Sequence, residues 1–195
     1  SNYSSGKQGY AIAEALAKLG ANTTLISGPT DLSDPVDVKI VRISSAQQML
    51  EACEAALPAD AAICVAAVAD WRVADEVPNK IKKSGSRAPA LDLVENPDIL
   101  ASIAGRSNDR PKLVIGFAAE TEAVVKHAMA KREKKNCDWI VANDVAPGTD
   151  TMGGDYNQVH LVTPDGVEAW PKTSKIDVAA RLAERIAAYF TKPSR

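Results

Sequence analysis

The sequence predicts an α/β fold: a three-layer α/β/α sandwich around a Rossmann-like, mainly parallel sheet, with an antiparallel hairpin late in the chain. Short apolar runs alternate with amphipathic helical patterns along the 195 residues, as in parallel sheets joined by helices. Ala61–Ala66 is apolar throughout, as in a central strand with helices on both faces. Val159–Val162 and Val167–Trp170 flank Asp165-Gly166, which is a hairpin signal, although Pro164 argues against a tight two-residue turn.

The first elements are a helix, two strands and a second helix. Gly9–Leu19 carries apolar residues at helical spacing and ends at Gly20, and Thr23–Ser27 is a short strand closed by a Gly-Pro pair. Val38–Ile43 alternates in polarity as a strand does, and Ala46–Leu57 is an amphipathic helix closed by a proline.

The second half repeats this alternation. Asn96-Pro97-Asp98 opens a short helix, with asparagine as the cap, proline at the first helical position and an acid in the first turn. After it come a buried strand over Lys112–Ala118, a helix from about Glu122 to Lys135, a strand over Trp139–Ala142, the hairpin, and a closing helix over Ile176–Phe190. No linker divides the chain, so residues 1–195 are expected to form a single domain.

Composition argues against several classes of protein. Hydrophobic residues make up 46% and charged residues 25%, as in ordinary globular domains, and the net charge of −2 argues against a nucleic-acid-coating protein. No apolar run is long enough to cross a membrane, and no secretory pattern is recognisable. Cys53, Cys64 and Cys137 are widely spaced, which predicts reduced, buried thiols in a cytoplasmic protein and argues against a structural zinc.

One candidate site follows the apolar strand Ala61–Ala66. The strand leads into Asp70-Trp71-Arg72 and then to Lys80, Lys82 and Lys83. Because ligands of open α/β sheets bind at the carboxyl ends of the strands, this pattern predicts a site for a polyanion that carries a ring. The alternative is a solvated basic loop. The string Ser84–Arg87 has little to bury, so this segment is expected to close over a bound ligand.

A second candidate lies at the start of the first helix. Ser4-Ser5-Gly6-Lys7-Gln8-Gly9 offers hydroxyls and free N–H groups at a helix N-terminus, which is an anion site by geometry. The stretch is neither a Walker A loop nor a G-x-G-x-x-G fingerprint. The alternative is simple capping of the helix by Ser5.

Three weaker signals lie in the second half. Lys131 and Lys135 share one helix face and could hold phosphate or complement a helix C-terminus. Phe117 ends a buried strand and could contact a base or pack in the core. Asn143-Asp144 and Asp155-Tyr156-Asn157 could ligate magnesium, recognise a substrate or serve only as turns.

Six stretches occur in order along the chain: Ser1–Ala13, Ala66–Arg72, Lys80–Lys83, Asn96–Leu100, Gly116–Thr121 and Ala142–Val145. Taken together, they resemble phosphopantothenoylcysteine synthetase, the CTP-dependent ligase of coenzyme A biosynthesis. In bacteria that family usually forms the C-terminal half of a bifunctional flavoprotein that also carries a decarboxylase.

The resemblance implies a two-step ligation. The carboxylate of 4′-phosphopantothenate attacks CTP and releases pyrophosphate, and the amine of L-cysteine then attacks the acyl-cytidylate to give the amide and CMP. Magnesium is expected on the triphosphate, with protein ligands unknown.

The resemblance also implies roles for individual residues. Lys80 matches the lysine needed to form the acyl-cytidylate, and Asn2 matches the asparagine that engages this intermediate and supports the cysteine step. The nucleotide-binding positions implied by the matched stretches are Ser4, Ser5, Gly6, Ala66, Ala67, Asp70, Lys80, Pro97, Asp98, Ile99, Leu100, Phe117, Lys131 and Lys135.

The chain departs from the family pattern at its start, because the family's first strand and the loop after it do not precede Asn2. The domain is therefore expected to lack that strand and the decarboxylase half with its flavin. The resemblance implies a homodimer, for which the Val159–Trp170 hairpin is a plausible interface. Two other functions stay open: an NAD(P)-dependent Rossmann oxidoreductase, suggested by helix Gly9–Leu19 followed by a strand, and a non-catalytic nucleotide-binding module.

Overall fold

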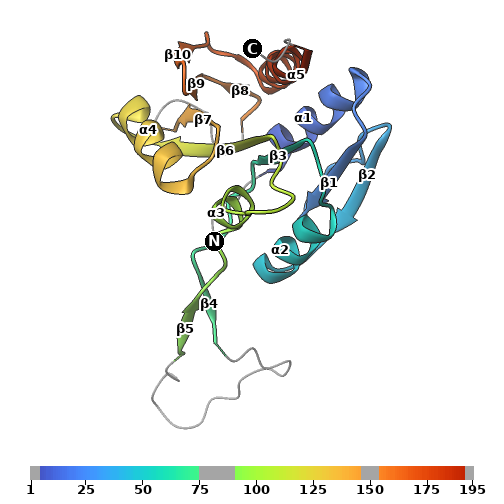
Figure 1. Cartoon of the computed structure of the whole chain (residues 1–195), viewed down its shortest axis with the longest axis vertical. Coiled ribbons are helices and arrows are strands. Elements are labelled where there is room, and N and C mark those ends of the chain that lie inside the picture. Colours follow the sequence, from blue (N-terminus) through green and yellow to red (C-terminus); the bar gives the residue numbers. More distant parts are fainter. Residues whose placement is uncertain (1–4, 75–90, 146–153, 192–195) are drawn as a thin grey trace.

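A five-stranded sheet forms the centre of the protein, as seen in a computed structural model that describes residues 5–74, 91–145 and 154–191 (Figure 1). The strand order is β10-β9-β7-β6-β3. The strands are β3 (Ala61–Cys64), β6 (Leu113–Glu120), β7 (Trp139–Asp144), β9 (Val159–Thr163) and β10 (Gly166–Ala169). β3, β6 and β7 run parallel, and β9 and β10 are antiparallel to their neighbours, so the predicted mixture of parallel strands and a late hairpin is confirmed.

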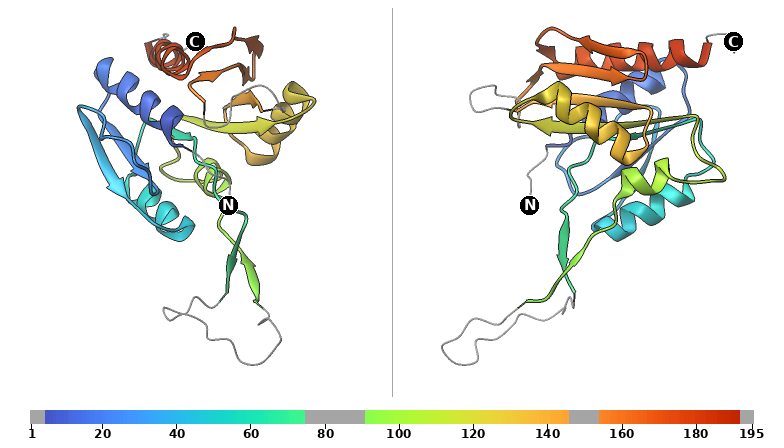
Figure 2. Two further views of the ribbon diagram at one scale, coloured as in Figure 1. Left: turned by 180° about the vertical axis from the view of Figure 1, so that it is seen from behind. Right: turned by 60° about the vertical axis from the view of Figure 1, so that its left-hand side comes forward.

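Helices cover both faces of this sheet, which confirms the three-layer prediction (Figure 2). Alternate residues of β6 point to the two faces of the sheet. Leu113 and Ile115 pack with α1 (Lys7–Lys18) and α5 (Lys175–Thr191) in one core cluster. Val114 and Ala118 pack with the other layer in a second cluster. That layer consists of α2 (Ala46–Ala55), α3 (Ile99–Ala104) and α4 (Val124–Lys135).

A second, two-stranded parallel sheet lies beside the first. It pairs β1 (Thr23–Ser27) with β2 (Val38–Arg42), with Thr23 opposite Val38. Within the described ranges, β1 pairs only with β2 and β3 pairs only with β6. The prediction that the Ala61–Ala66 run is a central strand is therefore wrong for this part of the chain, because β3 is an edge strand with half-buried residues.

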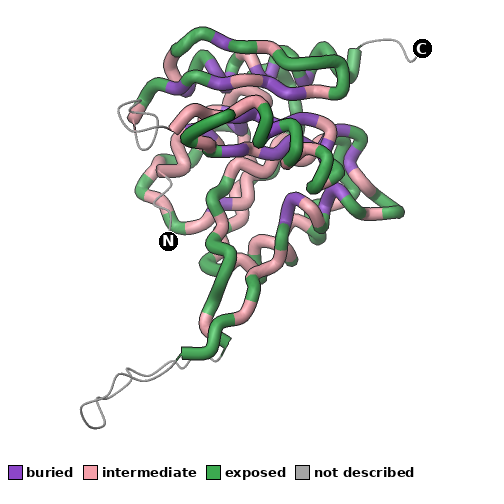
Figure 3. Tube along the Cα trace, turned by 90° about the vertical axis from the view of Figure 1, so that its left-hand side faces the viewer, coloured by how far each residue is buried: buried purple, intermediate pink, exposed green. Residues whose placement is uncertain are grey.

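A narrow ribbon projects from the body of the molecule, and it was not predicted (Figures 1 and 3). It pairs β4 (Trp71–Val73) with β5 (Leu93–Glu95) in antiparallel register. Trp71 is 55% exposed on it, so the aromatic residue that follows the β3 run faces solvent in the isolated chain. Another short pair, β8 (Tyr156–Asn157) and β11 (Thr173–Ser174), links the loop after β7 to the start of α5.

Two local predictions are corrected by the structure. The cap of α3 is Asp98, whose carboxylate accepts from the Ala101 N–H at 3.0 Å; Asn96 instead donates its side-chain N–H to the Ala69 carbonyl. The β9–β10 hairpin does use a two-residue turn, because Thr163 pairs with Gly166 across Pro164 and one further residue. Across the described ranges, no helix combines the length and apolar character needed to cross a lipid bilayer.

Candidate functional site

The first turn of α1 lies at the carboxyl end of the parallel strands. A methyl group at Gly9 would lie 3.7 Å from the Val65 side chain, so this turn packs against the chain leaving β3. Gly6 is the N-cap residue, with φ of 74°, and a glycine has no side chain that could accept from the first N–H groups. Ser5 is therefore not the cap, and the N-terminus of α1 keeps the donor groups that suit an anion.

Basic side chains gather beside this helix start. Lys7 Nζ lies 2.6 Å from Asp155 Oδ1, and this hydrogen bond lowers the pKa of the Asp155 carboxyl. Burial and the nearby charge of Lys7 lower the pKa of Lys175, the first residue of α5, which is only 8% exposed. The sequence had pointed to Lys7 and Asp155, whereas nothing in the sequence indicated that Lys175 would lie near them.

A buried set of side-chain amides continues from α1 to the end of β7. Gln8 Nε2 donates to the Lys175 carbonyl at 3.0 Å. Asn157 Nδ2 lies 3.4 Å from Gln8 Oε1 and 3.1 Å from Asn143 Oδ1. Asn157 is 1% exposed. Asn143 and Asn157, which the sequence left open as turn residues, are therefore joined within the structure, through contacts that a turn would not need.

A second group of candidate residues lies between α3 and α4. Lys131 Nζ donates to the Phe117 carbonyl at 2.9 Å. Phe117 is the first residue of β6 beyond the last pair with β3, and no other described strand pairs with it on that side. Lys135 pairs with Asp98. Burial alone would raise the pKa of Asp98, but the hydrogen bonds from Lys135 and the Ala101 N–H and the charges of both lysines lower it overall.

The structure thus brings Asp98, Phe117, Lys131 and Lys135 together, and the sequence had singled out all four as candidate nucleotide contacts. The Phe117 ring packs against the first core cluster, so the core-packing alternative holds for part of its surface. Ile99 and Leu100 are 7% and 9% exposed and belong to the second core cluster, so any ligand contact there falls to their main chain.

The segment between β3 and β4 carries the remaining described candidates. Ala66, Ala67 and Asp70 are exposed. The Asp70 carbonyl accepts from the Asn96 N–H at 2.8 Å, which ties this segment to the start of α3. Asn2, Ser4, Lys80, the other two lysines of the cluster and the predicted closing segment lie outside the described residues. In the described ranges, no three His, Cys, Asp or Glu side chains are grouped as a metal site would require.

Comparisons with known proteins point to one family. Residues 1–190 match the family described as DNA/pantothenate metabolism flavoprotein C-terminal domain. The coenzyme A biosynthesis bifunctional protein CoaBC of Haemophilus influenzae is 43% identical over 193 residues, which cover 98% of this chain and 48% of that protein. The CoaBC protein of Escherichia coli K12 is 42% identical over 198 residues, which cover 100% and 48%. The chain therefore spans about half the length of the curated relatives it matches.

Solved structures agree with this match. The chain resembles a crystal structure of the C-terminal domain of CoaBC with a TM-score of 0.77 and 37% identity, over 97% of this chain and 85% of that one. It also resembles the DNA/pantothenate metabolism flavoprotein of Streptococcus pneumoniae with a TM-score of 0.78 over 96% and 90% of the two chains. At 21% identity the second likeness concerns the fold alone.

Proposed function

The chain belongs to the family of the DNA/pantothenate metabolism flavoprotein C-terminal domain, and from this premise we propose that it is a CTP-dependent phosphopantothenate–cysteine ligase of coenzyme A biosynthesis. The observation that carries the proposal is the group formed by Asp98, Phe117, Lys131 and Lys135, four positions matched to nucleotide contacts and joined in pairs by hydrogen bonds. The uncapped start of α1 supports a site for the anionic parts of the substrates.

The proposed reaction has two balanced steps. A carboxylate oxygen of 4′-phosphopantothenate attacks the α-phosphorus of CTP, a phosphoanhydride bond breaks, and pyrophosphate leaves with the bonding electrons. The amine of L-cysteine then attacks the acyl carbon of the mixed anhydride, CMP leaves, and the amine loses a proton as the amide forms. Activation is needed because a free carboxylate is a poor electrophile, whereas the acyl-cytidylate carries a good leaving group.

Individual roles are part of the proposal. Lys80 stabilises the charge that develops at the α-phosphate, and Asn2 holds the acyl-cytidylate during the attack by cysteine. Ser4, Ser5 and Gly6 contact the anionic groups at the start of α1. The other proposed nucleotide contacts are Ala66, Ala67, Asp70, Pro97, Asp98, Ile99, Leu100, Phe117, Lys131 and Lys135.

Magnesium is proposed as a companion of the triphosphate, where it would neutralise phosphate charge. Mg²⁺ is commonly held by substrate phosphates with only one or two protein carboxylates. The described part of the chain offers no cluster of three ligating side chains. No step above is therefore assigned to the metal.

Assembly and context complete the proposal. We propose that residues 1–195 are one ligase domain in the cytoplasm, that the full polypeptide carries a decarboxylase domain, and that the ligase acts as a homodimer. Curated relatives named as bifunctional CoaBC proteins support the fusion. The family's first strand would fit the free edges that β1 and β3 show within the described ranges.

The test follows product and pyrophosphate in the full chain supplied with CTP, magnesium, 4′-phosphopantothenate and cysteine. We expect pyrophosphate to require phosphopantothenate, amide to require cysteine, and CTP to be strongly preferred to ATP. Lys80→Gln should abolish pyrophosphate release while weakening CTP binding by no more than roughly tenfold, because its charge acts mainly in the transition state. Asn2→Asp should still release pyrophosphate in a first turnover and then accumulate acyl-cytidylate.

Other outcomes identify the alternatives. Binding of CTP without turnover would indicate a non-catalytic nucleotide-binding module. Quenching of tryptophan fluorescence by NADPH but not by CTP would indicate the oxidoreductase.

A further inference from the structure

Three side-chain amides are joined in series between the start of α1 and the carboxyl end of β7. The series runs from the Lys175 carbonyl to Gln8, from Gln8 to Asn157, and from Asn157 to Asn143. We call Gln8, Asn157 and Asn143 the amide relay. Gln8 is 8% and Asn157 1% exposed, whereas Asn143 is half-buried at the end of β7.

The orientation of every amide in this relay follows from its first member. A backbone carbonyl can only accept a hydrogen bond, so Gln8 must turn its NH₂ group toward the Lys175 carbonyl and its oxygen toward Asn157. Asn157 must then present its NH₂ group, which also meets the Asn143 oxygen at 3.1 Å. Asn143 is left with its own NH₂ group turned away from Asn157.

The relay keeps this orientation although it leaves one buried atom unsatisfied. Asn157 Oδ1 is buried and has no hydrogen-bond partner among the described residues. Turning the Asn157 amide over would place its oxygen against the Gln8 oxygen, whose direction the Lys175 carbonyl fixes, and would lose the contact with Gln8. A buried acceptor without a donor destabilises the fold, so such an arrangement calls for a reason beyond packing.

The position of Asn143, at the far end of the relay, explains why this orientation is kept. Asn143 stands on β7 next to Ala119 of β6, at the carboxyl ends of two parallel strands. Among the described residues its NH₂ group meets no hydrogen-bond acceptor, and Gln8 at the near end belongs to the first turn of α1. A neutral amide with a fixed donor face suits the negatively charged oxygen of a substrate.

We infer that Gln8 and Asn157 are positioning residues that hold the Asn143 NH₂ group toward an anionic oxygen of the bound nucleotide or phosphopantothenate. This inference rests on the proposed function for the identity of the ligand. The relay itself rests on the distances among the amides and the Lys175 carbonyl.

The first test is Asn157→Asp in the full chain. A carboxylate has the size of the amide but cannot donate, so Asn143 turns its NH₂ group back toward residue 157 and presents its oxygen to the substrate. We expect kcat/KM for pyrophosphate release to fall by roughly tenfold or more, as when one hydrogen bond to a charged group is lost. If the buried carboxylate prevents folding, Asn157→Ser is used instead. Serine is uncharged and too short to reach both Gln8 and Asn143, so we expect the same fall in kcat/KM.

A matched control makes the same change away from the amide relay. Asn22 is exposed between α1 and β1, and Asn22→Asp should leave kcat/KM unchanged. A double-mutant cycle then separates positioning from general destabilisation. If Asn157 acts through Asn143, Asn157→Asp should add almost nothing to the loss caused by Asn143→Ser. If the losses of the two single variants instead multiply in the double variant, the inference is overturned.

A direct readout keeps this inference distinct from the proposed function. Side-chain ¹⁵N–¹H signals of Asn143 are followed while CTP, and separately 4′-phosphopantothenate, is added. We expect one of the two ligands to shift the Asn143 NH₂ signal in the parent and not in Asn157→Asp. Such shifts with no amide product would refute the proposed ligase but support the relay. An Asn143 signal that neither ligand moves, or that moves equally in both proteins, would refute the relay.

Discussion

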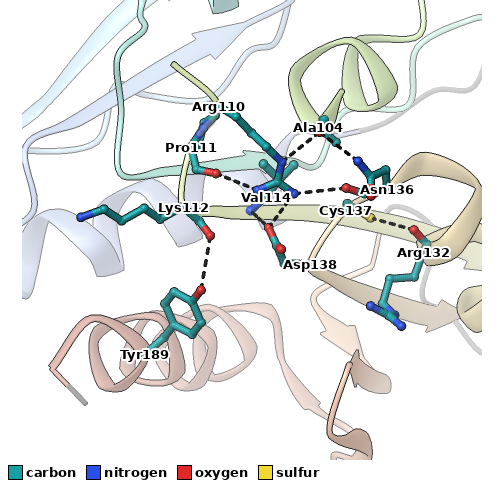
Figure 4. A network of polar contacts seen from close by, with 10 residues as sticks. All are labelled: Ala104, Arg110, Pro111, Lys112, Val114, Arg132, Asn136, Cys137, Asp138 and Tyr189. Atoms are coloured by element: carbon teal, nitrogen blue, oxygen red, sulfur yellow. Dashed lines mark hydrogen bonds and ion pairs between the residues drawn. The ribbon is translucent and has the colours of Figure 1, made fainter. Parts of the chain in front are cut away.

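Arg110 joins the C-terminal ends of two helices at the edge of the sheet where β6 begins, and Arg110→Lys is expected to destabilise the fold. Its guanidinium donates to the Ala104 and Pro111 carbonyls, both at 2.9 Å, and to the Asn136 carbonyl and Asp138 Oδ2, both at 3.1 Å (Figure 4). Ala104 is the last residue of α3 and Asn136 is the C-cap of α4. A cation at these carbonyls also suits the negative ends of the helices.

The magnitude follows from the number of bonds lost. A lysine ammonium has no planar fork, so it cannot reach four acceptors on different sides and should lose two or three of these hydrogen bonds. Each bond contributes about 0.5–1.5 kcal/mol. The Arg110 side chain is 26% exposed, so water replaces part of the loss. We expect a loss of about 2 kcal/mol in the free energy of unfolding, which lowers the melting temperature by about 4–8 °C in a chain of this size.

Urea and thermal denaturation of the two proteins measure this effect. Arg106→Lys is the matched control, because Arg106 is similarly exposed but, among the described residues, bonds only to the exposed carboxylates of Asp109 and Glu54. Exposed ion pairs contribute little, so the control should shift the melting temperature much less. Equal shifts for the two variants would refute the argument that the main-chain carbonyl acceptors distinguish Arg110 from Arg106.

Three further predictions concern the core, the α3–α4 pair and a thiol. Gly116→Ala should cost about 1–3 kcal/mol in unfolding experiments, because the new methyl group would lie 2.5 Å from Leu100 Cδ2; unchanged stability would contradict this packing. Asp98→Asn keeps the helix cap but loses the pair with Lys135. That pair lowers the pKa of Asp98 in the folded state, so in urea unfolding the parent should have a higher free energy of unfolding than Asp98→Asn at neutral pH. The difference should vanish as pH falls below about 4, and a difference independent of pH would contradict this argument. Burial raises the pKa of Cys64 to about 12, so iodoacetamide at a pH near 8 should leave Cys64 unmodified in the folded protein. Mass spectrometry measures the modification, and rapid labelling would contradict the burial of this thiol.

The layers of the fold were predictable because β6 and β7 are apolar on both faces, and only a strand between two helix layers needs that pattern. Their ends were not predictable. β7 continues through Asn143 and Asp144 because β6 extends beside it, with Ala119 opposite Asn143. Polar residues alone would have ended the strand, so the neighbouring strand decides its length here.

Other features that the sequence did not predict also depend on a partner that is distant in the chain. An apolar run such as Ala61–Ala66 has the same composition at the edge of a sheet as at its centre, and only the pairing in space distinguishes the two. β4 and β5 are three residues each, and their pairing joins segments about twenty residues apart in the chain, so neither strand carries a periodic signal of its own.

The candidate site was predictable by residue type and not by geometry. The spacing of Lys131 and Lys135 predicted a shared helix face, but their acceptors, the Phe117 carbonyl and Asp98, depend on where α4 packs against α3. The amide relay joins residues 149 and 14 positions apart, and the orientation of its amides comes from a backbone carbonyl. A sequence can name such amides as polar residues, but only the folded chain shows which way each one turns.

The same two helices are joined twice, and this bears on how the candidate nucleotide group is held. Arg110 bonds the C-terminal ends of α3 and α4, and the pair of Asp98 and Lys135 connects the start of α3 to the end of α4. Lys131 then ties α4 to the Phe117 carbonyl on β6. These contacts are all made within the folded chain, so the fold itself sets the spacing of the group. A site held in this way would lose little side-chain freedom on binding the nucleotide proposed above, which would favour precise placement of its phosphates.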